Sequence, residues 1–310
     1  MWLLVFGSCG RFCLLAREFA IVADRRDSGD NRQARIQTDR KMRKTIFALV
    51  IGITVAACAS EPSHYEDKND EGDDLGIAWV KDSAEYQAVS LQVFRAATLA
   101  LPQAISDTSW SALPGQSGAA SLPVAIILDV DETSLTNPVF QASFERPFSE
   151  KKLDDWSIEH EAVPAPGAKD FLAFAKASGV QIFFVTNRTC VEKAGSNDPC
   201  PQKKTVVDDL AEAGLPANYD NVSLSGERPG WGKEKQARRD HIAADYRVIM
   251  LFGDDLSDFI PCVRSRPAGD CKAAATDRSR QELTQLHSDM WGAGWYVLPN
   301  PMHGSWTSFR

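Results

Sequence analysis

Val-Ala-Ile-Ile-Leu-Asp-Val-Asp-Glu-Thr-Ser-Leu-Thr-Asn, residues 124–137, begins as a short aliphatic run and reaches two aspartates, Asp129 and Asp131. An apolar run of this length before a turn predicts a buried strand of a parallel sheet. In open α/β sheets, ligands and catalysis gather at the carboxyl ends of the strands. Two carboxylates at such an end are costly to bury unless a cation joins them. We therefore expect a divalent metal beside this pair.

Further aliphatic runs follow the first one, and stretches with helical spacing separate them. Further strands are predicted at residues 180–185, 222–224, 248–252 and 295–298, and helices at 79–105, 166–178, 202–213, 233–244 and 281–291. This alternation predicts an α/β fold with a doubly wound, mostly parallel, Rossmann-like sheet and an N-terminal helix. Residues 140–163 are aromatic and charged, which predicts a small insertion after the first strand.

The chain has 310 residues, of which 44% are hydrophobic and 25% charged. These values fit one medium globular domain with appendages. Residues 1–57 carry 10 of the 34 Lys and Arg and 5 of the 42 Asp and Glu, so the remainder has 24 basic and 37 acidic groups, a net charge of −13. Such a surface repels polyanions and argues against binding a nucleic-acid polymer.

The N-terminal region carries the features of an export signal. Met42-Arg43-Lys44 precedes an apolar run, residues 45–57, that is too short to span a bilayer and ends at Cys58. Val55-Ala56-Ala57-Cys58 resembles a bacterial lipobox, in which the cysteine becomes the lipidated first residue. Ala59 then favours sorting to the outer membrane, facing the periplasm. An ordinary signal peptide or a buried helix is the alternative.

The signal divides the chain into four parts. Residues 1–41 lie upstream of a complete signal, which suggests that Met42 is the true start; the alternative is that residues 1–16 are themselves a targeting segment. Residues 42–57 are the predicted lipoprotein signal peptide and 58–75 an acidic tether. Residues 76–310 form the main domain.

Four cysteines remain once residues 1–57 are removed and Cys58 is lipidated. They are Cys190, Cys200, Cys262 and Cys271. An even number in an exported chain predicts disulfides, for which three connectivities exist. The local pairs Cys190–Cys200 and Cys262–Cys271 are favoured because each brackets a loop that contains Pro or Gly.

Polar residues also follow or precede the other predicted strands. Thr186 follows the second strand, Lys235 lies in the helix before the fourth, and Asp254 and Asp258 follow the fourth. A lone Asp-x-Asp-x-Thr motif recurs by chance in chains of this length, but this conjunction in this order is specific.

In these segments the chain resembles the haloacid-dehalogenase (HAD) superfamily of phosphohydrolases, and more narrowly the class C (subfamily IIIB) acid phosphatases, which are outer-membrane lipoproteins. The resemblance spans about residues 76–310. It rests on Leu128-Asp-Val-Asp-Glu-Thr, Pro166-Gly-Ala, Phe184-Val-Thr-Asn-Arg188, Lys235-Gln-Ala-Arg-Arg239, Gly253-Asp-Asp-Leu-Ser-Asp-Phe259 and Leu298-Pro-Asn-Pro301. It implies a Mg²⁺-dependent phosphomonoesterase for small substrates, with 5′-nucleotides among them.

The chemistry of phosphomonoester hydrolysis gives the two aspartates different roles. The ordinary pKa of an aspartate keeps it ionised at neutral pH, so Asp129 can attack phosphorus without an activating base. Asp131 is placed to protonate the leaving oxygen and then to deprotonate water. The alternative is that both residues only cap a helix and have no catalytic role.

The resemblance supplies the remaining site residues. Mg²⁺ would bind Asp129, the backbone carbonyl of Asp131, and Asp254, while Asp258 would orient a metal-bound water.

The phosphoryl group would contact Thr186, Asn187 and Lys235. Lys233 competes with Lys235 for the lysine role, and the match to Lys-x-x-Arg-Arg favours Lys235.

The leaving-group pocket is assigned to Phe140, Trp156 and His303. In the family, aromatic residues in such places can stack on a nucleobase, but His303 stands where a tyrosine is expected. For Phe140 and Trp156, packing in the core or in a lid is the alternative.

Two other functions remain open from the sequence. One is phosphoryl transfer to an acceptor alcohol on the same fold, and the other is a lipoprotein that binds a ligand or partner without catalysis. The intact set of Asp129, Asp131, Thr186, Lys235 and Asp254 argues against the second. The oligomeric state is not predicted.

Overall fold

The computed structural model describes residues 72–143, 148–193 and 195–309. Its helices are α3 (Gly72–Asp82), α4 (Ala84–Ser106), η1 (Ala119–Ser121), α5 (Pro138–Ser143), α6 (Glu150–Glu159), α7 (Ala168–Ala177), α8 (Gln202–Glu212), α9 (Gln236–Ala243), η2 (Leu256–Asp258), α10 (Asp277–Leu286) and η3 (Ser305–Phe309). Its strands are β1 (Val124–Leu128), β2 (Leu135–Thr136), β3 (Val163–Pro164), β4 (Gln181–Thr189), β5 (Val222–Ser225), β6 (Arg247–Gly253) and β7 (Trp295–Val297).

Five strands form a sheet in the order β5-β4-β1-β6-β7, and every neighbouring pair is parallel. The strand that carries the aspartate pair, β1, lies at the centre, between β4 and β6. Its residues Ile126 and Leu128 are buried in one core and Ile127 in the other. An aliphatic run without polar positions suits this strand because both of its faces are covered.

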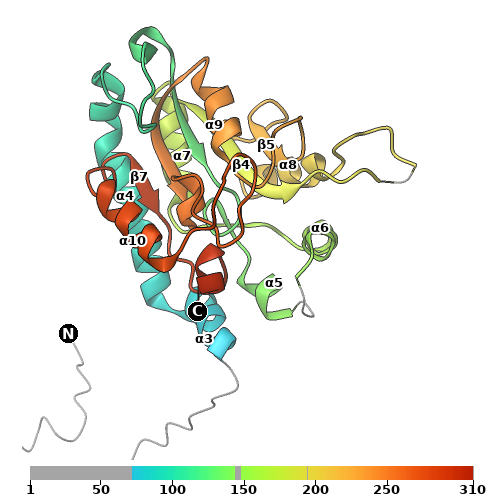
Figure 1. Cartoon of the computed structure of the whole chain (residues 1–310). Coiled ribbons are helices and arrows are strands. Elements are labelled where there is room, and N and C mark those ends of the chain that lie inside the picture. Colours follow the sequence, from blue (N-terminus) through green and yellow to red (C-terminus); the bar gives the residue numbers. More distant parts are fainter. Residues whose placement is uncertain (1–71, 144–147, 194, 310) are drawn as a thin grey trace, which may run out of the picture. The chain divides into compact units, whose positions relative to one another are not determined.

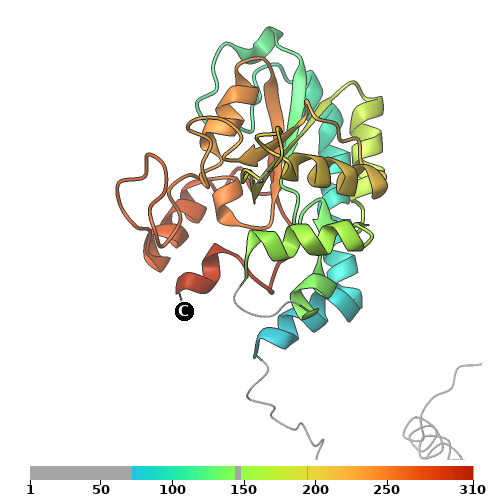
Figure 2. The ribbon, with the colours of Figure 1, turned by 90° about the vertical axis from the view of Figure 1, so that its right-hand side faces the viewer.

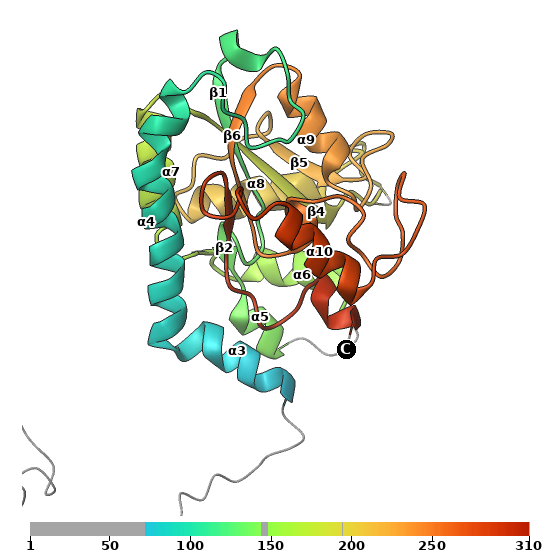
Figure 3. The same ribbon diagram turned by 60° about the vertical axis from the view of Figure 1, so that its left-hand side comes forward.

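Helices cover both faces of the sheet, as the sequence predicted (Figures 1 and 3). Side chains of α4, α7 and α8 pack with one face, including Phe94, Phe171 and Leu210. The other face packs against α9 and α10, through Ile242 and Leu283. The doubly wound α/β fold is confirmed, and it brings the ends of β1, β4 and β6 to one edge of the sheet.

The predicted insertion after β1 contains α5 and α6, and the antiparallel pair β2–β3 ties its two ends together. Figure 2 shows the two green helices of this insertion beside the blue helix α3. Helix α3 contacts α5. The insertion is thereby held next to the carboxyl ends of the strands.

Several predicted boundaries are wrong. Residues 79–105 form two helices rather than one, because Ser83 adopts an extended conformation and its Oγ accepts a hydrogen bond from the Tyr86 backbone N–H as an N-cap. Helix α3 begins at Gly72, so residues 72–75 of the predicted tether are helical.

Two later helices also differ from their predicted ranges. Helix α9 begins at Gln236 rather than at residue 233, and α10 ends at Leu286, before residue 291. Helix α10 also begins at Asp277, before the predicted residue 281, because Thr276 and Ser279 form a capping box at its N-terminus.

Both favoured disulfides are present, Cys190–Cys200 and Cys262–Cys271. Among the described residues, no helix has the length and apolar character needed to cross a membrane. The predictions for residues 1–41, the signal peptide at 42–57, the lipidation of Cys58 and most of the tether fall outside the described residues.

Candidate active site

A cavity of about 580 Å³ lies at the carboxyl ends of the central strands. It is lined by residues that follow β1 and β6, by residues 186–188 of β4, by the start of α6, and by the segment before η3. Strand β4 runs to Thr189, so Thr186 lies within this strand rather than after it, where the sequence predicted it. Its size is within the range of small-ligand sites. Among the predicted site residues it takes in Asp129, Asp131, Thr186, Asn187, Lys235, Asp254, Asp258 and His303.

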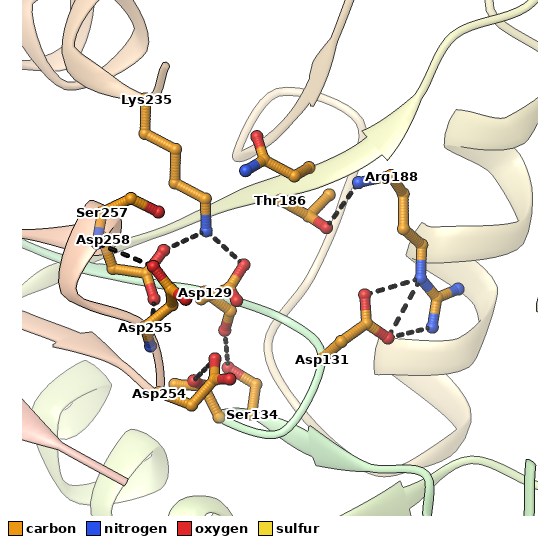
Figure 4. A network of polar contacts seen from close by, with 12 residues as sticks. Asp129, Asp131, Ser134, Thr186, Arg188, Lys235, Asp254, Asp255, Ser257 and Asp258 are labelled. Atoms are coloured by element: carbon orange, nitrogen blue, oxygen red, sulfur yellow. Dashed lines mark hydrogen bonds and ion pairs between the residues drawn. The ribbon is translucent and has the colours of Figure 1, made fainter. Parts of the chain in front are cut away.

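Three aspartates form what we call the carboxylate cluster: Asp129, Asp254 and Asp258. One oxygen of each lies within 4.8 Å of the others. The Nζ of Lys235 is 2.5 Å from Asp129 Oδ1 and 2.6 Å from Asp258 Oδ1. Lys235 therefore contacts two of the three carboxylates, and its single positive charge leaves the cluster with an excess of negative charge (Figure 4).

Two aspartates of the cluster have raised pKa values, and the excess of negative charge is one of the causes. Burial, with the nearby charges of Asp258 and Asp131, raises the pKa of Asp129 to about 7 in spite of the contact with Lys235. Burial and the same kind of repulsion also raise the pKa of Asp254 well above its ordinary value. Without a bound cation, this shift makes Asp129 a weaker acid than a free aspartate, and the positive charge of a cation would act against the shift. That Asp129 is the ionised nucleophile stays a prediction.

Backbone contacts fix the position of Asp129 at the end of β1. Its N–H donates to the carbonyl of Phe252 in β6 (3.0 Å), and its carbonyl accepts from Ser134 Oγ (2.6 Å). The side chain is thus held between the central strand and its neighbour.

The other side of the cluster follows β6. Asp255 is the N-cap of η2, and Asp258 Oδ2 accepts from the Asp255 backbone N–H (3.0 Å) in a capping box. The Asp258 side chain then packs directly on Gly253, where a Cβ atom would overlap it. The glycine in Gly253-Asp254-Asp255 is required by this close approach.

Lys235 lies at the N-cap position of α9 and is almost completely buried. Its side chain makes no capping bond and extends instead to the cluster. The arginines of the Lys-x-x-Arg-Arg match support this edge: Arg239 donates to the Asp258 carbonyl (2.5 Å), and Arg238 to the Thr186 carbonyl.

Asp131 lies in a second group of polar contacts, which we call the arginine network: Asp131, Arg188, Asp209 and Ser157. The guanidinium of Arg188 donates to Asp131 through Nη2 (2.7 Å to Oδ1) and Nε (3.1 Å to Oδ2). Its Nη1 donates to Asp209 Oδ2 (2.7 Å) and to Ser157 Oγ (3.4 Å). Figure 4 shows the Asp131 side chain turned toward Arg188 and away from the carboxylate cluster.

Arg188 shifts the pKa of Asp131 in the direction opposite to the shift at Asp129. Burial acts to raise the pKa of Asp131, but the charge and hydrogen bonds of Arg188 outweigh it and lower the pKa below its ordinary value. Asn137 Nδ2 also donates to Asp131 Oδ1 (2.9 Å). The two aspartates of the motif therefore have pKa values shifted in opposite directions.

The predicted phosphate ligands Thr186 and Asn187 lie between these two groups, at the end of β4. Thr186 is buried, and its Oγ1 accepts from the Arg188 backbone N–H (3.0 Å). The Asn187 side chain accepts from Arg238 Nη2 (2.8 Å). Their role toward phosphate stays a prediction.

The two candidate lysines have different partners. Lys233 contacts Glu150 of the insertion (2.7 Å), the Asn187 carbonyl and Thr189 Oγ1, whereas Lys235 contacts the nucleophile candidate Asp129. This geometry supports the preference for Lys235.

The predicted leaving-group residues separate. His303 lines the cavity and lies 3.5 Å from Glu132 Oε1. Phe140 and Trp156 are not among the lining residues; their rings pack on each other at 5.6 Å, and Trp156 stacks on His160. The packing alternative describes these two residues, and Phe148 of the insertion lines the cavity instead.

The carboxylate cluster fits a hard divalent cation. Its donors are all oxygens, which Mg²⁺ prefers, and the raised pKa values of Asp129 and Asp254 reflect a charge that a cation would neutralise. Asp258, predicted only to orient a water, is close enough to join Asp129 and Asp254. The role predicted for the Asp131 backbone carbonyl stays a prediction.

Arg188 and Asp209 are not among the site residues predicted from the sequence. Arg188 is the last residue of the segment Phe184–Arg188, which carries part of the family resemblance, so the sequence offered a reason to consider it. Asp209 lies 21 residues further on, within a helix, and nothing in the local pattern marks it.

Comparisons with known proteins agree with this geometry. A family model described as HAD superfamily, subfamily IIIB (acid phosphatase), matches residues 51–306. Two solved structures of the class C acid phosphatase from Bacillus anthracis are similar to this chain, each with a TM-score of 0.60 over 76% of this chain and 87% of the other. Sequence identity is 25% for the one with tungstate bound and 26% for the second.

Proposed function

This chain belongs to the acid phosphatases of HAD subfamily IIIB, which makes it a phosphoric monoester hydrolase, and from that premise we propose that it works with Mg²⁺ through an aspartyl-phosphate on Asp129. The observation that carries the proposal is the separation of Asp129 and Asp131 into two polar environments. One aspartate faces Lys235 and two further carboxylates, and the other faces Arg188. A reaction that needs a nucleophile and a separate proton donor needs this division.

In the first step, an Asp129 carboxylate oxygen attacks phosphorus and the bond to the leaving oxygen breaks. The leaving oxygen takes its proton from Asp131, so an alcohol departs and Asp129 carries the phosphoryl group. In the second step, water attacks the phosphorus and gives a proton to Asp131, and the bond between phosphorus and the Asp129 oxygen breaks. Inorganic phosphate leaves, and both aspartates return to their starting states.

Asp129, Asp254 and Asp258 are the residues that would hold the metal. When bound, Mg²⁺ supplies positive charge for the phosphoryl oxygens. Lys235 offers a second positive charge to the same oxygens, and Thr186 offers a hydroxyl group. The bacterial relative with tungstate bound is consistent with this class of ligand, because tungstate is a tetrahedral oxyanion like phosphate.

We further propose that the substrates include 5′-nucleotides and that the enzyme is anchored to the outer membrane through Cys58, facing the periplasm. His303, Phe148 and Leu153 line the cavity and offer ring and aliphatic surface to a leaving group. A Cys58→Ser variant should appear in the soluble fraction of cells that retain the wild-type protein in membranes.

The reaction is tested by release of inorganic phosphate from p-nitrophenyl phosphate, nucleotides and sugar phosphates with Mg²⁺ present. We expect the Asp129→Asn variant to be inactive and EDTA to inhibit the wild type. Full activity in that variant, or undiminished activity in EDTA, would contradict the proposal. Phosphate transferred to added glycerol, rather than to water, would favour the phosphotransferase.

A further inference from the structure

Arg188 lies between two carboxylates and contacts each through a different edge of its guanidinium. Nε and Nη2 donate to Asp131, and Nη1 donates to Asp209 at 2.7 Å. The guanidinium is planar, and its donors form a rigid fork. A partner that holds one edge therefore also sets the direction of the other edge.

Asp209 is suited to hold that edge. It is the one charged residue among the buried residues of α8, whose other buried residues are Val206, Val207 and Leu210. A carboxylate in this position costs free energy unless it is paired, and its ion pair is with Arg188. An apolar side chain would fill the core as well, so packing alone does not explain a charged group here.

The insertion also reaches this point. Ser157 of α6 is buried, and its hydroxyl oxygen accepts from Arg188 Nη1 at 3.4 Å. Helix α6 contacts α8. The side chain of Arg188 therefore connects β4 with helix α8 and with the insertion. The same side chain contacts Asp131.

We infer that Asp209 is a positioning residue for the phosphatase reaction: it orients Arg188, and Arg188 orients the Asp131 carboxylate for proton exchange with the leaving oxygen. The inference rests on the acid role of Asp131 in the proposed function. Asp209 itself does not contact the substrate cavity, since it is absent from the lining residues.

Leaving groups of different basicity separate this role from a structural one. An alkoxide leaves poorly without a proton, whereas p-nitrophenolate leaves without one. A misplaced acid therefore slows hydrolysis of an alkyl phosphate more than hydrolysis of p-nitrophenyl phosphate. The quantity to compare is kcat/KM, because it includes only the steps up to the first irreversible one. The later hydrolysis of the phosphoenzyme does not affect it.

The experiment measures kcat/KM for glycerol 2-phosphate and p-nitrophenyl phosphate with Mg²⁺ in the wild type and in Asp209→Asn. We expect a loss of roughly 10- to 100-fold for the alkyl substrate and of less than about threefold for the aryl one. Asp208→Asn is the matched control. Asp208 is the adjacent residue of α8, is half exposed and pairs with Lys204 at the surface, so both values should stay at the wild-type level.

Both substrates are measured on one preparation, so a lower folded fraction changes both values equally and leaves their ratio intact. Asp209→Glu keeps the charge but moves the carboxylate by one methylene, and we expect an intermediate ratio. If Asp209→Asn gives no soluble protein, Asp209→Glu carries the test. An unchanged ratio in either soluble variant overturns the inference.

Asp131→Asn separates failure of the inference from failure of the proposed function. It should shift the ratio at least as far as Asp209→Asn does. If Asp131→Asn shifts the ratio and the Asp209 variants do not, only the positioning role is wrong. If Asp131→Asn leaves the ratio unchanged, the acid role of Asp131 is wrong as well.

Discussion

The carboxylate cluster and the arginine network begin two residues apart in the chain, yet they have opposite charge balances. In the cluster, Lys235 pairs with two of the three carboxylates, those of Asp129 and Asp258, and burial raises the pKa of Asp129 to about 7. In the network, Arg188 outweighs the effect of burial and lowers the pKa of Asp131. The turn after β1 accounts for the separation. Side chains two residues apart in a strand share one face, but β1 ends at Leu128, before both aspartates.

The difference teaches that residue type does not assign the roles of the two aspartates. Asp129 and Asp131 are chemically identical, and their surroundings alone distinguish them. A cluster with unneutralised negative charge attracts a cation and a phosphoryl group. A carboxylate held at two points by a guanidinium has a fixed direction, which suits a group that moves protons.

The largest effect should come from replacing each aspartate in turn. Asp129→Asn should form no phosphoenzyme and lose at least about 1,000-fold in activity, because the nucleophile is gone. Asp131→Asn should still form the phosphoenzyme from p-nitrophenyl phosphate and accumulate it, because the base that activates water is missing. Acid quench with ³²P-labelled substrate measures both, and labelled Asp129→Asn protein would contradict the assignment.

The next largest effect concerns metal binding, which should depend on the carboxylate cluster and not on the arginine network. Saturating the wild type with Mg²⁺ at about 100 times its Kd should stabilise the protein by about 2.7 kcal/mol, which is seen as a higher Tm. Asp254→Asn should lose most of this increase because a carboxylate of the cluster is gone. Asp209→Asn should keep the increase, whatever its own starting Tm. Thermal unfolding with and without Mg²⁺ measures it, and an increase retained in Asp254→Asn would place the metal elsewhere.

A smaller effect is expected from Gly253→Ala, where the added Cβ would overlap the side chain of Asp258. Displacing Asp258 should destabilise the protein by about 1–3 kcal/mol and weaken its response to Mg²⁺. Gly232→Ala is the control, because a Cβ there meets nothing within 4 Å and its φ angle is not positive. Denaturant unfolding of the two variants tests the comparison, and equal stabilities would show that the contact at Gly253 relaxes freely.

The smallest effect is a pH dependence of stability in the metal-free protein. The raised pKa of Asp129 means that the folded protein holds this proton more tightly, so its stabilisation is complete below about pH 4 and is lost as pH rises through about 7. Asp131 has the opposite sign, and its contribution is lost as pH falls below the ordinary range of aspartate.

The free energy of unfolding should therefore be about 1–2 kcal/mol lower at pH 7 than at pH 5 without metal. In Asp129→Asn the decrease should be shallower, and Mg²⁺ should reduce it in the wild type. Urea titrations at the two pH values measure the difference. Equal slopes in wild type and variant would show that Asp129 does not carry it.

Much of the site was predictable because it follows strand ends. Buried parallel strands are continuous aliphatic runs, and their carboxyl ends meet at one edge, so Asp129, Thr186 and Asp254 could be placed together from local patterns. Helix boundaries were less predictable, as Ser83 shows, because a single capping residue interrupts an apolar spacing that continues through it. Phe140 and Trp156 could not be placed, because an aromatic side chain packs equally well in a core or a pocket wall.

The sequence by itself determined the order of the sheet strands along the chain and the aspartate pair at the end of β1, and it favoured the local disulfides, since these depend on residues close together in sequence. Only the tertiary structure decided that Asp131 would turn away from the carboxylate cluster, toward Arg188 and its partner Asp209. Charge interactions act through space, and the partners of each aspartate come from strands and helices that lie far apart in the chain. The surroundings of each aspartate, and with them the role that we propose for it, are therefore a property of the fold.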